Sequence, residues 1–186
     1  MQYHVNGFNP GDPDVQPAAQ GHRRTGDPLP ETVDVLIAGT GPAGLCLAAQ
    51  LARVPTIRTL VVEPKLGPME KGQADGISVR SMEMFQAFGF AEKFMRESVW
   101  INETTFWAPG TDAALDRVAR VQDVPDGTSE MPHVLINQAR VHDMFLDIMR
   151  NSPTRLEPDY GLKVLDLKID STATEYPVTV KLEHTA

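Results

Sequence analysis

A glycine loop between two apolar segments constrains the fold of this chain more than any other feature of the sequence. Residues 33–38 are nearly continuous apolar sequence, as in a strand that is buried on both faces of a parallel sheet. The loop, Gly-Thr-Gly-Pro-Ala-Gly at 39–44, follows at once, and the pattern then predicts a helix over 42–53 and a second strand over 59–62. Glu63 closes that second strand. Strand, glycine loop, helix, strand and acid in this order predict a Rossmann-like βαβ unit.

Each glycine of the loop has a physical role in such a unit. Gly39 permits the tight turn out of the strand, Gly41 lets a pyrophosphate approach the backbone, and Gly44 lets the helix pack closely on the strand. Pro42 suits the first helical turn, where its missing N–H costs nothing. With Ala43 it begins the helix whose free N–H groups and positive dipole end face the phosphates.

The acid after the second strand indicates which nucleotide fits. Glu63, followed by Pro64, stands where a carboxylate accepts hydrogen bonds from a ribose 2′-hydroxyl. An acid here disfavours a 2′-phosphate, so the pattern fits FAD or NAD better than NADP. We therefore predict a site for the adenosine diphosphate half of a dinucleotide. The alternative is a βαβ unit with an incidental glycine turn.

Composition excludes several other classes of protein. The 186 residues are enough for one ordinary domain, and a formal charge of -8 with no basic run beyond residues 22–24 argues against a nucleic-acid partner. The single Cys46 excludes an internal disulfide framework. No segment approaches about 18 consecutive apolar residues, and the start of the chain lacks an apolar signal core. We expect a cytoplasmic protein that binds neither a membrane nor a metal.

The rest of the chain alternates helical and extended patterns. In order, the sequence predicts a tight turn at 73–76, helices over 79–88 and 91–97, strands over 99–107 and 117–124, a short apolar segment at 133–136, a helix over 137–150, and an antiparallel pair of strands over 165–169 and 178–182. The strands between 99 and 124 do not fit a simple βαβαβ progression, so they indicate an inserted antiparallel layer. We expect His142, beside Asp143 and next to the apolar stripe of its helix, to have a surface or capping role rather than a catalytic one.

Several segments together resemble a known family. Besides the glycine loop and Glu63, they are residues 1–11, 73–85, 101–107, 120–123, 132–143 and 150–158. They resemble the flavoprotein aromatic hydroxylases, in the branch of phenol 2-monooxygenase and 3-hydroxybenzoate 4-monooxygenase. The resemblance covers nearly the whole chain. It implies an α/β, Rossmann-like FAD-binding fold of the p-hydroxybenzoate hydroxylase type, interleaved with antiparallel strands and truncated.

The resemblance also implies a domain organisation and a chemistry. Residues 1–30 are rich in Gly, Pro, Asp and Gln, and this composition predicts an extended N-terminal arm. The resemblance makes 31–186 the N-terminal part of the FAD-binding domain, with the start of a substrate domain inserted at about 99–135. NADPH would reduce the FAD, and the reduced flavin would use O₂ to hydroxylate a phenol such as phenol or 3-hydroxybenzoate. Members of the family are several times longer, so we expect the isolated chain to be inactive. We also expect a full-length form to be a homodimer.

Site residues follow from the same resemblance, position by position. Asp75 matches the aspartate beside the flavin ring and the substrate hydroxyl, where it would favour deprotonation of the phenol. His133 matches a residue near the substrate pocket, so Asp75 and His133 are the catalytic candidates. Gln73 begins the loop near the flavin, Arg80 would contact FAD phosphate or ribose, and Gln138 would bond the FAD from a helix start.

Each assignment has a structural alternative. Asp75 with Gly76 is also a common turn pair, Arg80 could be a helix-surface charge, and Gln138 could only cap its helix. His133 could equally be a core histidine with satisfied hydrogen bonds. Two other functions also stay open: an NAD-linked Rossmann dehydrogenase, and a nucleotide-binding or partner-binding remnant without chemistry.

Overall fold

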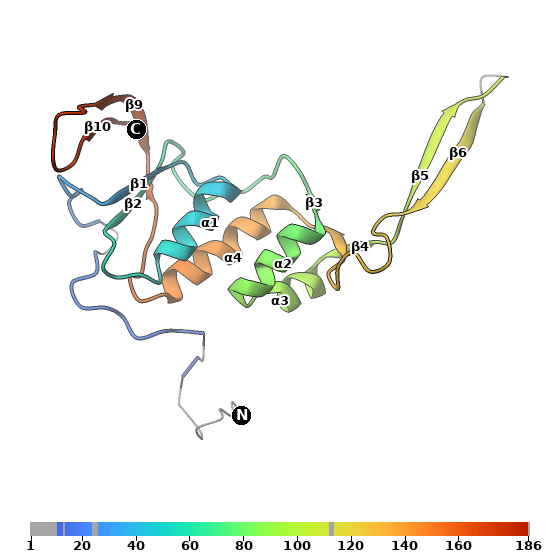
Figure 1. Cartoon of the computed structure of the whole chain (residues 1–186), viewed down its shortest axis with the longest axis horizontal. Helices are drawn as coiled ribbons and strands as arrows, with labels where there is room; N and C mark the ends of the chain where they lie inside the picture. The colour runs from blue at the N-terminus through green and yellow to red at the C-terminus, as the bar shows by residue number, and fades with distance from the viewer. Residues whose placement is uncertain (1–10, 13, 24–25, 112–113, 186) are drawn as a thin grey trace. The chain divides into compact units, whose positions relative to one another are not determined.

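The computed structural model describes residues 11–12, 14–23, 26–111 and 114–185 (Figure 1). The start of the predicted N-terminal arm, residues 1–10, lies outside these ranges. The chain forms two compact units. The first comprises Met1–Glu70 with Val141–Ala186, and the second comprises Lys71–Arg140.

The first unit is built on a short parallel sheet. Its strands β1 (Val35–Ala38), β2 (Thr59–Glu63) and β8 (Asp159–Tyr160) lie in the order β1-β2-β8, and α1 (Pro42–Leu51) connects the first two. The predicted strand, helix and strand are thereby confirmed. Strand β8 was not predicted, because it has only two residues and so carries no periodicity. Strand β8 pairs with β2 in the same parallel sheet. The second unit therefore lies within the chain segment that connects β2 to β8.

The two faces of this sheet are covered differently. Strands β9 (Leu162–Ile169) and β10 (Val178–His184) form the predicted antiparallel hairpin. Leu60 and Val62 of β2 pack with Leu162 in one buried cluster. Because successive side chains of a strand alternate, Val61 points to the opposite face, where α1 packs. Figure 1 shows the sheet strands with α1 beside them and the hairpin at the far side from the helix.

Helix α4 (Gln138–Asn151) begins in the second unit, and its residues from Val141 onward belong to the first. Of the predicted apolar stripe, Val141, Phe145 and Met149 are buried and Ile148 is only half-buried, while Met144 and Leu146 are buried as well. The stripe is wider than one face requires, and it includes His142, which is only 3% exposed. The predicted surface position of His142 is therefore wrong.

The described part of the N-terminal arm runs along the segment that follows α4. The N–H of Gln16 donates to the carbonyl of Asn151 at 2.9 Å, and the N–H of Ala19 donates to the carbonyl of Pro153 at 2.8 Å. Arg23 then forms two hydrogen bonds with the Asp159 carboxylate, at 2.6 and 2.7 Å. The arm is thus held by backbone pairs and one bidentate ion pair.

The second unit combines two helices with two small antiparallel sheets. Its elements are β3 (Gly76–Ile77), α2 (Val79–Phe88), α3 (Ala91–Glu97), β4 (Val99–Ile101), β5 (Glu103–Pro109), β6 (Leu115–Gln122) and β7 (His133–Leu135). The sheets have the orders β3-β7-β4 and β5-β6. Phe85 and Phe94 form an edge-to-face pair with ring centroids 4.9 Å apart at the junction of α2 and α3.

One predicted strand is divided. The β-rich stretch over 99–107 forms β4 and β5, which belong to different sheets and are separated at Asn102. The reason is partner choice, because β4 pairs with β7 while β5 pairs with β6. Both strands have similar composition, so periodicity alone does not reveal the break.

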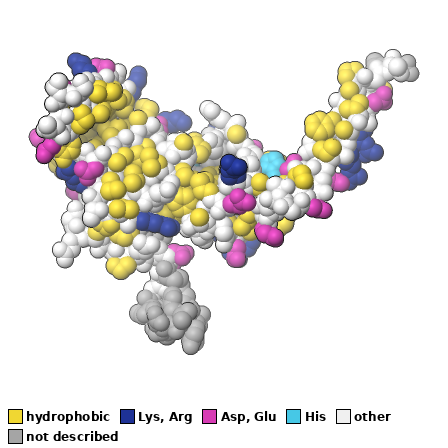
Figure 2. All heavy atoms as spheres, viewed as in Figure 1, with side chains coloured by type: hydrophobic (Ala, Val, Ile, Leu, Met, Phe, Trp, Pro, Cys, Tyr) yellow, Lys and Arg dark blue, Asp and Glu magenta, His cyan; other side chains and the backbone are white. Residues whose placement is uncertain are grey.

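Both hairpins expose apolar side chains (Figure 2). On β5 and β6 the exposed ones are Phe106, Trp107, Leu115, Val118 and Val121, and on β9 and β10 they are Leu165, Leu167, Ile169 and Val178. A two-stranded hairpin with uncovered faces is only marginally stable in water. None of the helices in the described ranges is long and apolar enough to cross a membrane.

The close approach of α1 to β1 gives the first prediction. A Cβ atom at Gly44 would lie 2.2 Å from the carbonyl oxygen of Gly39. We expect Gly44→Ala to lower the free energy of unfolding by about 1–3 kcal/mol, because the helix must shift away from the strand. Urea denaturation followed by circular dichroism measures this change.

Gly41→Ala is the matched control for that experiment. A Cβ at Gly41 meets no described atom within 4 Å, and its φ of -64° suits any residue. Its urea midpoint should therefore stay close to that of the parent chain. Equal midpoints for the two variants would show that the approach of helix to strand does not depend on Gly44.

Candidate functional site

The glycine loop leaves the start of α1 open. Gly39 has a φ of +101°, and its N–H donates to the carbonyl of Val62 at 2.7 Å, which turns the chain out of β1. Gly41 occupies the N-cap position with extended backbone, and no described side chain caps the helix. The N–H groups of the first turn are therefore available to an anion, with the helix dipole in its favour.

Glu63 joins the end of β2 to this loop. Its Oε2 accepts hydrogen bonds from the N–H and the hydroxyl of Thr40, both at 2.8 Å, and Oε1 accepts one from the N–H of Lys65 at 3.1 Å. Burial by itself raises the pKa of Glu63, but the hydrogen bonds from Thr40 and Lys65 together lower it below its usual value. The carboxylate is thus ionised at neutral pH, and its oxygens keep lone pairs for a ligand hydroxyl.

Sequence reasoning missed Thr40 as a part of this site. The signal was available, because Thr40 lies between two loop glycines and carries a hydroxyl. Its partner could not be identified from the sequence, since Glu63 comes from a different strand of the sheet.

A buried histidine lies behind the loop. His142 is 3% exposed, and its Nε2 lies 3.5 Å from the backbone nitrogen of Met69. Burial lowers the pKa of His142, and Asp143, the Thr40 backbone and Glu63 oppose that shift only in part. A neutral ring therefore packs against the elements that carry the glycine loop and the acid.

In the second unit, two of the predicted cofactor residues meet. The backbone N–H of Gln73 donates to the side-chain Oε1 of Gln138 at 2.9 Å. The carbonyl of Asp75 accepts a hydrogen bond from the N–H of Ile136 at 2.9 Å. This bond holds the segment before β3 at the carboxyl end of β7. The side chains of Asp75 and Arg80 are exposed. Residues 73–75 form an irregular segment with a bend at Gln73, and Gly76 is the first residue of β3, so the predicted tight turn at 73–76 is not formed.

The two predicted catalytic residues lie on neighbouring segments of this unit. His133 is the first residue of β7, which pairs with β3 directly after Asp75. Its Nδ1 lies 2.7 Å from Oδ2 of Asp123, and a Cβ placed on Gly76 would be 3.4 Å from its Nε2. The geometry thus brings the ring of His133 to Gly76, the residue that follows Asp75.

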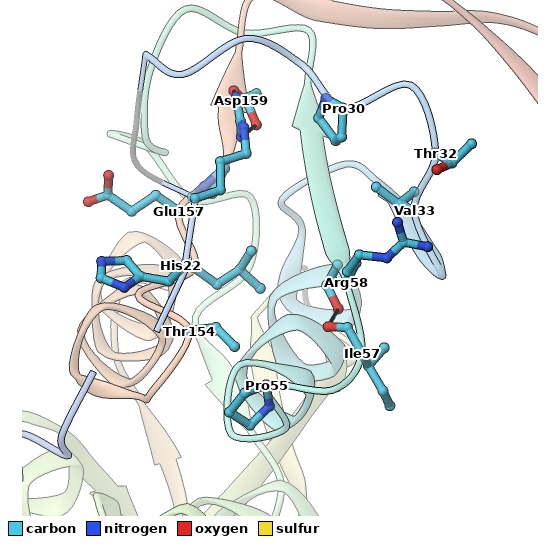
Figure 3. A pocket seen from close by; sticks show the side chains of 15 residues that line it. His22, Pro30, Thr32, Val33, Pro55, Ile57, Arg58, Thr154, Glu157 and Asp159 are labelled. Atoms are coloured by element: carbon cyan, nitrogen blue, oxygen red, sulfur yellow. Dashed lines mark hydrogen bonds and ion pairs between the residues drawn. The ribbon is translucent and has the colours of Figure 1, made fainter. Parts of the chain in front are cut away.

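A pocket of about 250 Å³ in the first unit is not part of this arrangement (Figure 3). Val33, Ile57 and Asp159 line it, and they stand at the amino ends of β1, β2 and β8. Ligands of parallel α/β sheets bind outside the carboxyl ends of the strands, where the glycine loop lies. The charges at this pocket are also engaged, because Asp159 binds Arg23 and Arg58 binds Asp34.

A βαβ unit with an open glycine loop and an ionised acid at the end of the next strand defines a dinucleotide-binding domain. The chain belongs to the FAD binding domain family, whose model matches residues 32–177. This membership confirms the family and the cofactor class that the sequence predicted.

Comparisons with individual proteins agree with that assignment. The chain is 58% identical over 185 residues to 3-hydroxybenzoate 4-monooxygenase of Comamonas testosteroni, which covers 98% of this chain and 29% of that protein. It is 29% identical over 124 residues to phenol 2-monooxygenase of Aspergillus fumigatus, covering 67% and 21%. The structure of p-nitrophenol 4-monooxygenase from Pseudomonas putida superposes with a TM-score of 0.68 at 19% identity, covering 82% and 36%. The likeness confirms the predicted fold type, and the chain spans well under half the length of each relative.

His142 gives a prediction about stability and pH. Its pKa in the folded chain lies below the value of about 6.5 that it has when unfolded. The unfolded chain therefore takes up a proton that the folded chain does not, so stability is present above pH 6.5 and falls as the pH drops below it. We expect a loss of up to about 1 kcal/mol between pH 6.5 and 5.5 that is absent in His142→Gln.

Urea denaturation at both pH values measures this difference. The exposed His184 provides the matched control, since His184→Gln should keep the pH dependence of the parent chain. An identical pH dependence in His142→Gln and the parent would contradict the prediction.

Proposed function

We propose that this chain is the FAD-binding part of an NADPH-dependent monooxygenase that hydroxylates phenols. One observation carries the proposal. The ionised Glu63 carboxylate is tied to the glycine loop through Thr40, beside the uncapped start of α1. The names of two relatives, 3-hydroxybenzoate 4-monooxygenase and phenol 2-monooxygenase, support the substrate class.

The first unit binds the adenosine diphosphate half of FAD. The backbone from Gly39 to Gly44, including Gly41, Pro42 and Ala43, receives the pyrophosphate. Glu63 accepts hydrogen bonds from the adenosine ribose, and Pro64 directs the chain away from it. Because a carboxylate repels a 2′-phosphate, this site selects FAD over NADPH, which acts as the co-substrate.

The second unit supplies the residues assigned to the flavin side. Gln73 and Gln138 hold each other by a 2.9 Å hydrogen bond and present the loop that carries Asp75. Arg80 is an exposed cation suited to an FAD phosphate. The bound cofactor supplies activation of O₂ and transfer of one oxygen atom to the ring. Asp75 and His133 serve the substrate, by removing or organising the proton of its hydroxyl.

Calorimetric titration of the chain with ADP, FAD and NAD⁺ tests the binding roles. We expect Glu63→Gln to weaken both ADP and FAD roughly tenfold or more, because a hydrogen bond to a charged acceptor contributes about 1.5–3 kcal/mol. Gln138→Ala should weaken FAD and leave ADP unchanged, since only the flavin side is altered.

Asp34→Asn is the matched control, because Asp34 is an exposed carboxylate before β1 that pairs with Arg58 instead of the loop. It should leave both affinities unchanged. Tighter binding of NAD⁺ than of FAD would favour the dehydrogenase alternative and contradict the proposal. Hydroxylation is tested on the natural protein that carries this chain, by NADPH oxidation and product formation with 3-hydroxybenzoate or phenol.

A further inference from the structure

Three side chains of the second unit form a hydrogen-bonded series that ends at His133, whose Nε2 faces Gly76. They come from different strands. Thr104 lies on β5, Asp123 follows β6 directly, and His133 begins β7. The N–H of Asp123 donates to the carbonyl of Asn102 at 3.0 Å, which extends the pairing at the base of the β5–β6 hairpin. The hairpin therefore determines where the Asp123 carboxylate lies.

Both oxygens of that carboxylate are engaged. Oδ2 lies 2.7 Å from Nδ1 of His133, and Oδ1 accepts the hydroxyl hydrogen of Thr104 at 3.1 Å. The Asp123 side chain is 16% exposed and that of His133 is 31% exposed, so the contact is largely sheltered from water. An ionised carboxylate only accepts hydrogen bonds, so Nδ1 of His133 must carry the hydrogen. In the neutral ring the lone pair is then on Nε2.

The lone pair on Nε2 of His133 faces Gly76, which follows Asp75, the other catalytic candidate, along the chain. A Cβ on Gly76 would lie 3.4 Å from Nε2, so the absence of a side chain there keeps this nitrogen open. Asp75 precedes Gly76, and its carbonyl is held by the N–H of Ile136. Nε2 is therefore directed to Gly76, the residue after Asp75, across the β3–β7 pair.

We infer that Asp123, held by Thr104, is a positioning residue that fixes the tautomer of His133, so that Nε2 accepts the proton of the phenolic hydroxyl. The inference rests on the proposed function. In the step, the phenol O–H bond breaks, the proton moves to Nε2, and the electron pair stays on oxygen as phenolate. The imidazolium that forms keeps its Nδ1–H on the Asp123 carboxylate, which stabilises the new charge.

The tautomer can be measured without any cofactor. Long-range ¹H–¹⁵N NMR of the labelled chain identifies which ring nitrogen of His133 is protonated. We expect the neutral ring to be protonated on Nδ1 in the parent chain. Asp123→Ala should yield a mixture of both tautomers, and the conservative Asp123→Glu should restore part of the Nδ1–H form. Thr104→Val, which keeps the shape but removes the hydroxyl, should have a smaller effect in the same direction.

Glu103→Ala is the matched control. Glu103 pairs with Arg120 on the exposed surface of the same hairpin, so its replacement removes a contact of that hairpin without touching Asp123. It should leave the His133 tautomer unchanged, and the amide spectrum of each variant shows whether it is folded. Protonation on Nε2 in the parent chain, or the same tautomer in Asp123→Ala and the parent, would overturn the positioning role.

Kinetics of the natural protein that carries this chain test the proton transfer. Asp123→Ala should lower kcat for the phenol roughly 100-fold, within the usual contribution of general base catalysis, while its affinity for FAD stays unchanged. An unchanged kcat in a variant that has lost the tautomer would overturn the catalytic part of the inference. The absence of hydroxylation in the parent protein would overturn the proposed function and leave the NMR result standing.

Discussion

The hydrogen bonds between Glu63 and Thr40 are the interaction on which the first unit depends. They join the end of β2 to the loop that leaves β1, so the acid and the start of α1 keep one geometry. Burial disfavours the carboxylate charge, and the hydrogen bonds from the loop and from Lys65 outweigh that cost. The result is an anionic acceptor beside a helix terminus that attracts anions. A nucleotide needs both, because its ribose donates hydrogen bonds while its phosphates accept them.

Two histidines of this chain show how surroundings decide chemistry. His142 is buried beside the glycine loop, where burial favours the neutral ring and gives it a packing role. His133 is partly exposed and has a carboxylate on Nδ1, which leaves Nε2 directed to Gly76. The first histidine supports a binding site by staying neutral, whereas the second is suited to accept a proton. Their environments come from the strands around them, and neither could be assigned from residue type.

Local patterns predicted most of the elements. The continuous apolar run before Gly39 and the helical spacing of apolar residues in α2 and α4 are local patterns that packing only reinforces. The errors occurred where pairing decides the structure. Asn102 separates two strands of similar composition because their partners differ, and β8 is too short to carry a pattern. The stripe of α4 is buried more widely than one face requires, so His142 is inside.

The sequence by itself determined the βαβ unit, the glycine loop and the acid, because these depend on spacing along a continuous segment. It also determined the candidates Asp75, His133 and Gln138 through their resemblance to a family. Only the tertiary structure decided which partners they have: Thr40 for Glu63, Gln73 for Gln138, and Asp123 for His133. Each pair joins atoms from segments that are brought together by strand register and helix packing. A one-residue change of register would turn those side chains away, and no local pattern encodes that register.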